Sequence, residues 1–196
     1  MSKTKLFFVL LLFSPWIWIF SRNFSALSNQ SLSLPLVNLS SHEFLTTVNT
    51  FQSQARDRNL TTIGRVTVNK YSWYAKLLLD RYLESFDASF LFFTGDLDPL
   101  KSTRDTGPLL LTLVPLIGLG VSTQIKLKSY LPLVLLLASP LPAMFVFSHY
   151  ESISRIFVFL ALTYLAAIGL SWLLPKRNLL TLWAIVFLFE FTRFLH

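Results

Sequence analysis

Long apolar runs dominate this chain and limit what it can fold into. A helix needs about 20 predominantly apolar residues to cross the hydrocarbon core of a bilayer. Five runs approach this length, at 6–20, 107–125, 130–147, 156–174 and 179–195. The 196 residues are 53% hydrophobic and 14% charged, whereas soluble domains are about 25% charged. The sequence therefore predicts an all-α membrane protein with about five transmembrane helices.

The runs divide the chain into three parts. We predict a first transmembrane helix in 1–21, an extracytoplasmic loop with interfacial helices in 22–106, and a four-helix transmembrane region in 107–196. The first run has an alternative interpretation as a cleaved secretory signal, because two lysines precede it and small residues follow it at 26–28. We favour a retained helix, because the run ends in bulky aromatics and tryptophan prefers the membrane interface.

Basic residues in the short connections indicate an orientation, because Lys and Arg beside membrane helices favour the cytoplasmic side. They form three pairs, which are Lys3 with Lys5, Lys126 with Lys128, and Lys176 with Arg177. With five crossings, all three pairs would face the cytoplasm. The sequence therefore predicts a multi-pass protein of the cell membrane with a cytoplasmic N-terminus and an extracytoplasmic C-terminus.

Charge and composition argue against several function classes. The loop 22–105 holds nine Lys or Arg and eight Asp or Glu, so it supplies only +1 of the net charge of +7. A nucleic-acid-binding protein would concentrate basic residues on its soluble face, so we expect no DNA or RNA partner. There is no cysteine, and His42, His149 and His196 stand in no metal-ligand spacing. We expect neither a metal site nor a cofactor.

The long outer loop is predicted to carry amphipathic helices. A Ser/Glu capping pattern followed by apolar residues at helical spacing predicts a short helix at 41–54. At 70–85 aromatic and leucine residues repeat every three or four positions, which predicts a helix on the bilayer with charged residues such as Arg81 and Glu84 toward water. The Phe-rich run at 86–93 is expected to dip into the interface.

Polar residues near the membrane ends of this loop are candidate site residues. Asp96 and Asp98 form an Asp-x-Asp pair of the kind that holds a divalent cation in some sugar-nucleotide transferases. Asp beside Gly or Pro is also ordinary turn chemistry, so both interpretations stand. Lys101 and Arg104 come just before the second run, at headgroup depth. Basic residues there hold a lipid phosphate or simply anchor the chain at the interface.

A second polar cluster lies between the third and fourth runs. It contains His149, Glu151 and Arg155. A histidine and a carboxylate beside a membrane cleft have the residue types for acid–base work, while the alternative is a solvated loop.

Prolines and charges interrupt the later runs. Pro140 and Pro142 break or kink the third run and leave carbonyl groups that protein or water must satisfy. Such irregular backbone tends to line a cavity in membrane proteins. The fifth run carries Glu190 and Arg193, three residues apart on one helical face, where they can pair or reach the interface.

Several sequence patterns together indicate a family. They are Asn-Lys-Tyr-Ser-Trp-Tyr at 69–74, Phe-Leu-Phe-Phe at 90–93, Gly-Asp at 95–96, an apolar run with Pro115, Ser-Pro-Leu-Pro-Ala at 139–143, and Arg155. From about Phe44 to His196 the chain resembles the C-terminal half of bacterial multi-pass glycosyltransferases. This group is related to the dolichyl-phosphate-mannose protein mannosyltransferases.

The resemblance implies a fold and a reaction. Members have a membrane-embedded C-type fold and transfer sugar from a polyprenyl-phosphate donor at the outer membrane face. The residues expected at the lipid phosphate are Lys101, Arg104 and Arg155, with Asp96, His149 and Glu151 as further polar contacts. The acidic catalytic residue of the family lies in an early outer loop that nothing here matches, so no catalytic residue is assigned.

Two functions remain open from the sequence. The chain could be the partial or accessory half of a polyprenyl-phosphate-sugar-dependent glycosyltransferase, with a second multi-pass membrane chain supplying the catalytic loop. Alternatively, it could be a non-catalytic interaction or scaffold protein of the cell envelope. Both predict membrane lipids as partners, and the first adds a polyprenyl-phosphate-linked sugar.

Overall fold

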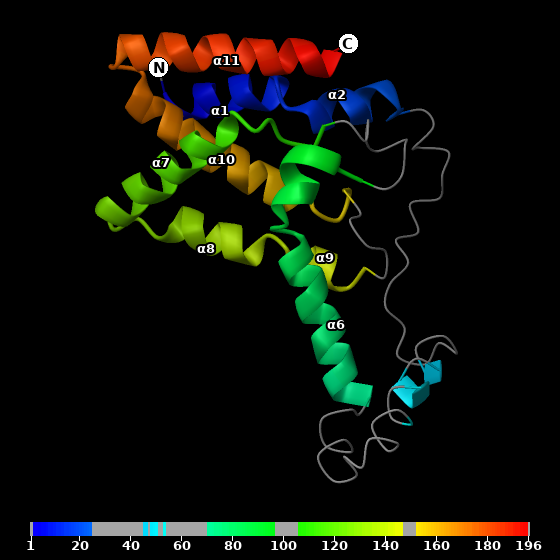
Figure 1. Ribbon diagram of the computed structural model, residues 1–196. Coiled ribbons are helices and arrows are strands. Elements are labelled where there is room, and N and C mark those ends of the chain that lie inside the picture. The colour runs from blue at the N-terminus through cyan, green and yellow to red at the C-terminus, as the bar shows by residue number, and fades with distance from the viewer. Residues whose placement is uncertain are drawn as a thin grey trace.

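The computed structural model describes residues 2–24, 45–46, 48–50, 53, 70–96, 106–146 and 152–195. In chain order, its elements are α1 (Lys3–Leu12), α2 (Pro15–Arg22), α6 (Lys70–Glu84), the π-helix η1 (Ser89–Thr94), α7 (Leu113–Lys126), α8 (Leu131–Ala138), α9 (Leu141–Met144), α10 (Ile156–Leu173) and α11 (Arg177–Leu195). These ranges contain helices and no strand element (Figure 1), so the all-α prediction is confirmed. The helix expected at 41–54 lies largely outside the described residues.

Helix α10 forms the centre of the fold, and α7 crosses it at close range (Figure 1). Of the 18 residues of α10, 61% are buried. The close approach depends on two glycines: a Cβ added at Gly169 would overlap the carbonyl of Leu116, and one at Gly120 would overlap the carbonyl of Leu165. Small residues allow helix backbones to touch in this way within membranes.

The first apolar run forms two helices rather than one. α1 and α2 meet at a bend of 52°. Pro15 opens α2 and has no N–H to donate to the carbonyl of Leu11, as a continuous helix would require. Side chains satisfy neighbouring carbonyls instead, since Ser14 Oγ donates to the carbonyl of Leu10 at 3.0 Å. The bend therefore follows from a proline inside the run.

Helix α11 packs on the rest of the protein through one aromatic stripe. The ring of Phe13 lies 5.8 Å from that of Phe187 and 5.0 Å from that of Phe191. Only 11% of its most apolar window is buried, and residues such as Leu182 and Phe189 are exposed. The helix therefore leaves most of its apolar surface uncovered.

A carboxylate fixes α11 to the start of α7. Glu190 accepts hydrogen bonds from the N–H groups of Leu111 at 2.5 Å and Thr112 at 2.9 Å. On the same face, Trp183 Nε1 donates to the carbonyl of Thr112 at 3.0 Å. Glu190 thus satisfies N–H groups at the beginning of a helix, where a negative charge is favourable.

Within the described residues, fewer helices are long and apolar enough to span a membrane than the five that the sequence predicts. α10 and α11 are each long and apolar enough to cross a membrane, and the bent pair α1–α2 makes a third if it counts as one span. α7 has 14 residues, about 21 Å of helix, and α8 and α9 together are equally short. α7 begins late because the preceding backbone packs on η1, where the Leu109 N–H donates to the carbonyl of Leu91 at 3.0 Å.

The two ends of the helix bundle differ in charge. The start of α1, the end of α7 and the turn between α10 and α11 all lie at the left of Figure 1. These segments carry six exposed cations, which we call the basic end: Lys3, Lys5, Lys126, Lys128, Lys176 and Arg177. Nearly all the described carboxylates belong to α6 and the segment that follows it, at the opposite end.

Helix α6 leaves the bundle at this opposite end and runs crosswise to α11 (Figure 1). Its bounds match the helix predicted at 70–85 within one residue, and Lys76 and Asp80 are exposed as predicted, but the last turns differ. Arg81, predicted to face water, is 2% exposed, whereas Leu79 and Leu83 are 54% and 56% exposed. The prediction failed because Arg81 turns inward to an ion pair with Glu84.

Candidate functional site

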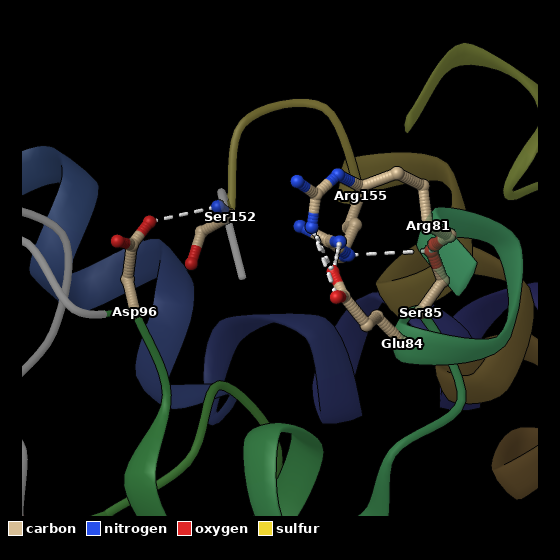
Figure 2. A network of polar contacts seen from close by, with 6 residues as sticks. All are labelled: Arg81, Glu84, Ser85, Asp96, Ser152 and Arg155. Carbon is tan, nitrogen blue, oxygen red and sulfur yellow. Dashed lines mark hydrogen bonds and ion pairs between the residues drawn. The ribbon is translucent and has the colours of Figure 1, made fainter. Parts of the chain in front are cut away.

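A cluster of polar side chains gathers where α6, η1 and the start of α10 meet. We call it the polar junction, and Figure 2 shows its members: Arg81, Glu84, Ser85, Asp96, Ser152 and Arg155. Five of these side chains belong to buried residues, and Glu84 is 15% exposed. The junction therefore places charged groups out of contact with bulk water.

One carboxylate pairs with two guanidinium groups. Arg81 Nη1 lies 2.9 Å and 3.0 Å from the two carboxylate oxygens of Glu84. Arg155 Nη2 lies 3.2 Å from Glu84 Oε2. Arg81 and Arg155 are 2% and 1% exposed, and buried charges are tolerated where they are paired and hydrogen-bonded. The sequence predicted that Arg81 and Glu84 face water, and it gave no sign that Arg155 would join them.

Arg155 is held on three sides. Its Nε donates to Ser85 Oγ at 3.2 Å, and the same hydroxyl donates to the carbonyl of Arg81 at 3.1 Å. The guanidinium carbon stands 5.2 Å from the centre of the Phe90 ring, within the range of a cation–π contact. Arg155 also precedes the first residue of α10. The helix start, the α6 end and η1 together fix this side chain.

Asp96 ties the end of η1 to the turn before α10. Its Oδ2 accepts from the N–H of Ser152 at 2.7 Å, and its side chain is buried. Gly95, with φ of 66°, lets the chain leave η1 in the direction that this contact requires. The hydroxyl oxygen of Ser152 is buried and has no hydrogen-bond partner. Asp96 thus binds a backbone N–H that lies 56 residues later in the chain, which is a tertiary contact rather than a local turn.

The other predicted site residues cannot be placed beside this cluster. Lys101, Arg104, His149 and Glu151 lie outside the described residues, as does Asp98. Of the six candidates, the structure brings Asp96 and Arg155 into one cluster. It adds four residues that the sequence reasoning missed, which are Arg81, Glu84, Ser85 and Ser152.

An apolar cavity of about 440 Å³ lies along α10, and none of the six junction residues belongs to its lining. This volume falls within the range of about 300–1,000 Å³ that small-molecule pockets occupy. Phe157, two residues after Arg155, belongs to its lining, so the cavity begins in the first turn of α10. Its walls come from α1, α8, α9 and α10, and are Phe7, Pro132, Leu135, Ala138, Ser139, Pro142, Phe157, Leu160, Ala161 and Tyr164.

The broken helix α8–α9 forms one wall of this cavity, as the prolines predict. α8 ends at Ala138 and α9 begins at Leu141. The carbonyl of Leu136, which would pair with the missing N–H of Pro140, accepts from Ser139 Oγ at 2.6 Å. The carbonyl of Leu137 accepts from the hydroxyl of Tyr82 on α6 at 2.9 Å. Protein groups thus satisfy the carbonyls that the break exposes.

The arrangement offers buried, paired charges before the start of α10 and an apolar cavity along the same helix. The parts of the chain that the structure describes hold no group of three His, Asp or Glu able to bind a metal ion. Searches against protein families, curated proteins and solved structures find no match to this chain. The cavity and the junction are therefore the features from which a function can be inferred.

Proposed function

We propose that the protein is a multi-pass membrane protein that binds a polyprenyl-phosphate-linked sugar and serves as the accessory half of a glycosyltransferase at the outer membrane face. The carrying observation is the apolar cavity along α10, whose first lining residue on this helix, Phe157, comes two residues after Arg155. A lipid-linked sugar has an apolar chain and a charged phosphate, so it needs an apolar cavity and a polar site in succession. α10 passes both.

The lipid chain would occupy the cavity. Its lining side chains are almost entirely apolar, with Ser139 and Tyr164 as the members that carry hydroxyl groups. Ser139 already donates its hydroxyl to a backbone carbonyl, so the surface offered to a ligand is hydrocarbon-like. Burial of apolar area supplies affinity without directional demands, which suits a flexible prenyl chain.

The phosphate would lie at the end where α10 begins. Lys101, Arg104 and Arg155 are the cations proposed to meet it, and Glu84 and Ser85 hold Arg155 in position. Bidentate contacts from Arg to phosphate are strong and geometrically specific. Because Arg155 is 1% exposed, the proposal requires the groups that cover it to move when the phosphate binds.

The basic end supports the orientation proposed for this function. With the basic end in the cytoplasm, the junction and cavity mouth face the outer side, where the donor lipid would be used. α7 and the broken pair α8–α9 are short for full spans, and we propose that both nonetheless lie within the bilayer beside α10. The proposal thus keeps about five membrane segments.

The catalytic carboxylate would come from a second multi-pass membrane chain. The large exposed apolar face of α11 is the proposed contact surface, since α11 has only 11% of its apolar window buried. Affinity purification from native membranes tests this partner. Co-purification of another multi-pass chain, lost when Phe189 is replaced by Asn, is the expected result.

Filling the cavity tests the donor site. Ala161→Phe would place a ring inside the cavity, whereas Ala75→Phe places one on an exposed position of α6. If the ring removes roughly 60 Å² of lipid contact, at about 25 cal/mol per Å², binding of a polyprenyl phosphate falls about tenfold. Equal affinities for the two variants, at equal melting temperatures, would argue against the proposed site.

A scaffold function is the second candidate, and the state of Arg155 favours it. Its guanidinium is engaged by Glu84, Ser85 and Phe90, which is the pattern of a structural residue. Under this alternative the purified chain binds partner proteins but no polyprenyl phosphate, and the same binding assay separates the two functions.

A further inference from the structure

The basic end concentrates positive charge from separate parts of the chain. Its six cations come from the first turn of α1, the end of α7 with the following turn, and the turn between α10 and α11. All six side chains are exposed. No Asp or Glu occurs in the sequence at 1–6, 121–130 or 171–180, so none of these segments supplies a counter-charge of its own.

Exposed apolar and aromatic residues lie next to these cations. Leu127, Tyr130 and Leu131 follow Lys126, with 62%, 55% and 68% of their surface exposed. Trp172 and Leu179 flank the other turn, at 42% and 51%. A nucleic acid or an acidic soluble protein would leave this surface in water. A lipid bilayer covers it and places its phosphates at the level of the cations.

The turn between α10 and α11 has room for a headgroup. An open hollow of about 480 Å³ is lined by Pro175, Lys176, Arg177, Asn178 and Leu179. Two of these side chains are cationic, and the amide of Asn178 adds hydrogen-bond donors. Lys176 Nζ stands 3.1 Å from the centre of the Trp172 ring, which holds the ammonium group at the depth where tryptophan prefers to lie.

The turn after α7 contains a lysine, Lys128, in a backbone conformation that would be less strained for glycine. Lys128 has φ of 53°, the left-handed conformation that glycine usually supplies after a helix. The turn closes with Ser129 N–H donating to the carbonyl of Gln124 at 3.0 Å. A lysine at this position costs backbone energy and provides charge at the basic end.

From these observations we infer that the basic end binds the head groups of anionic phospholipids, with the α10–α11 turn as the principal contact. This site lies at the opposite end of the bundle from the polar junction and takes a different lipid. Lys176 and Arg177 contact the phosphate, and the neighbouring apolar residues contact the acyl chains. Polybasic segments beside membrane helices attract anionic lipids in this manner.

Tryptophan quenching by brominated lipids tests the inference in the full chain. The protein is reconstituted in phosphatidylcholine vesicles that contain a minority of brominated phosphatidylglycerol or, separately, brominated phosphatidylcholine. The quenching of Trp172 is obtained as the difference in fluorescence quenching between the parent protein and the Trp172→Phe variant. Both leaflets contain the same lipids, so the direction of insertion does not affect the reading, and no polyprenyl lipid is present, so the result is independent of the proposed function.

The expected result is stronger quenching of Trp172 by the anionic lipid. Replacing Lys176 and Arg177 by Gln should lower the preference for anionic lipid about 30-fold. The matched control is Lys76→Gln, because Lys76 also stands over a tryptophan, at 5.1 Å from the Trp73 ring centre, but on α6. This control should leave the Trp172 preference unchanged.

Three results would overturn the inference. They are equal quenching of Trp172 by the two lipids, an undiminished preference in the double variant, and an equal loss in the Lys76 control. Exposed Gln at 176 and 177 removes no buried contact, so the double variant should fold. Its melting temperature in detergent confirms this.

Discussion

The crossing of α7 and α10 gives the sharpest test of the fold, because two glycines there have opposite surroundings. Gly169 lies on α10 against α7, where an added Cβ would overlap the carbonyl of Leu116 and lie 3.1 Å from the N of Gly120. Gly118 lies on α7, and a Cβ there meets nothing within 4 Å. The perturbation is Gly169→Ala, with Gly118→Ala as its control.

The expected magnitude follows from what the added methyl group touches. At Gly169 the obstacle is backbone rather than the tip of a flexible side chain, so α7 and α10 must move apart. Overpacking of this kind costs about 1–3 kcal/mol, while Ala gains about 1 kcal/mol over Gly within a helix. Gly118→Ala keeps the gain without the clash. The two variants should therefore differ by about 2 kcal/mol.

Thermal unfolding in detergent, followed by tryptophan fluorescence, measures this difference. For a chain of this size, about 2 kcal/mol corresponds to a shift of roughly 4–8 °C. Gly118→Ala should melt at or slightly above the parent temperature and Gly169→Ala several degrees below it. If Gly169→Ala is as stable as Gly118→Ala, the helices do not touch at this crossing and the reasoning fails.

Four further predictions concern polar contacts and orientation. Glu84→Gln leaves two buried guanidinium groups without their shared counter-charge and should lower stability by about 3 kcal/mol, measured by the same unfolding assay. Tyr82→Phe should cost about 1 kcal/mol, because the carbonyl that the Tyr82 hydroxyl binds loses this donor. No loss of stability in Tyr82→Phe would contradict that contact. Glu190→Gln removes the charge at the start of α7 and should cost about 1 kcal/mol, with a stability loss that shrinks in high salt; a loss independent of salt would contradict an electrostatic role. In intact cells an impermeant maleimide should label Ser53→Cys and spare Ser122→Cys until the membrane is permeabilised, and the reverse pattern would refute the proposed orientation.

Where local sequence determines structure, the sequence predictions agree with the observed elements. The helices expected at 70–85 and 156–174 are α6 and α10 with their bounds changed by one residue. The break between α8 and α9 falls at the predicted prolines, because the missing N–H and the ring clash of proline are properties of the residue itself. α11 begins two residues earlier than the run at 179–195.

Features that depend on tertiary contacts escaped prediction. The run at 107–125 looks apolar enough for a span, but Gly107 and the residues after it pack on η1, so the helix starts only at Leu113. Hydrophobicity does not reveal that this backbone packs on η1 instead of extending the helix. Likewise Arg155 was expected at a lipid phosphate, while its partner Glu84 lies 71 residues earlier in the chain, a distance over which no spacing rule operates.

The inward Arg81 and the exposed Leu79 and Leu83 of α6 suit the same physical setting as the apolar helices, while Lys76 and Asp80 are exposed as predicted. In water this arrangement would be unfavourable for two reasons. Leu79 and Leu83 would leave apolar surface in contact with water, and burial of Arg81 would remove its charge from water. Beside a bilayer the outward surface is hydrocarbon, so leucines face out without loss, and a charge is better placed inward, where Glu84 can pair with it. The arrangement of α6 is thus the one that a helix at the membrane would adopt. It also explains why an amphipathic pattern read with water as the solvent assigned Arg81 to the wrong face.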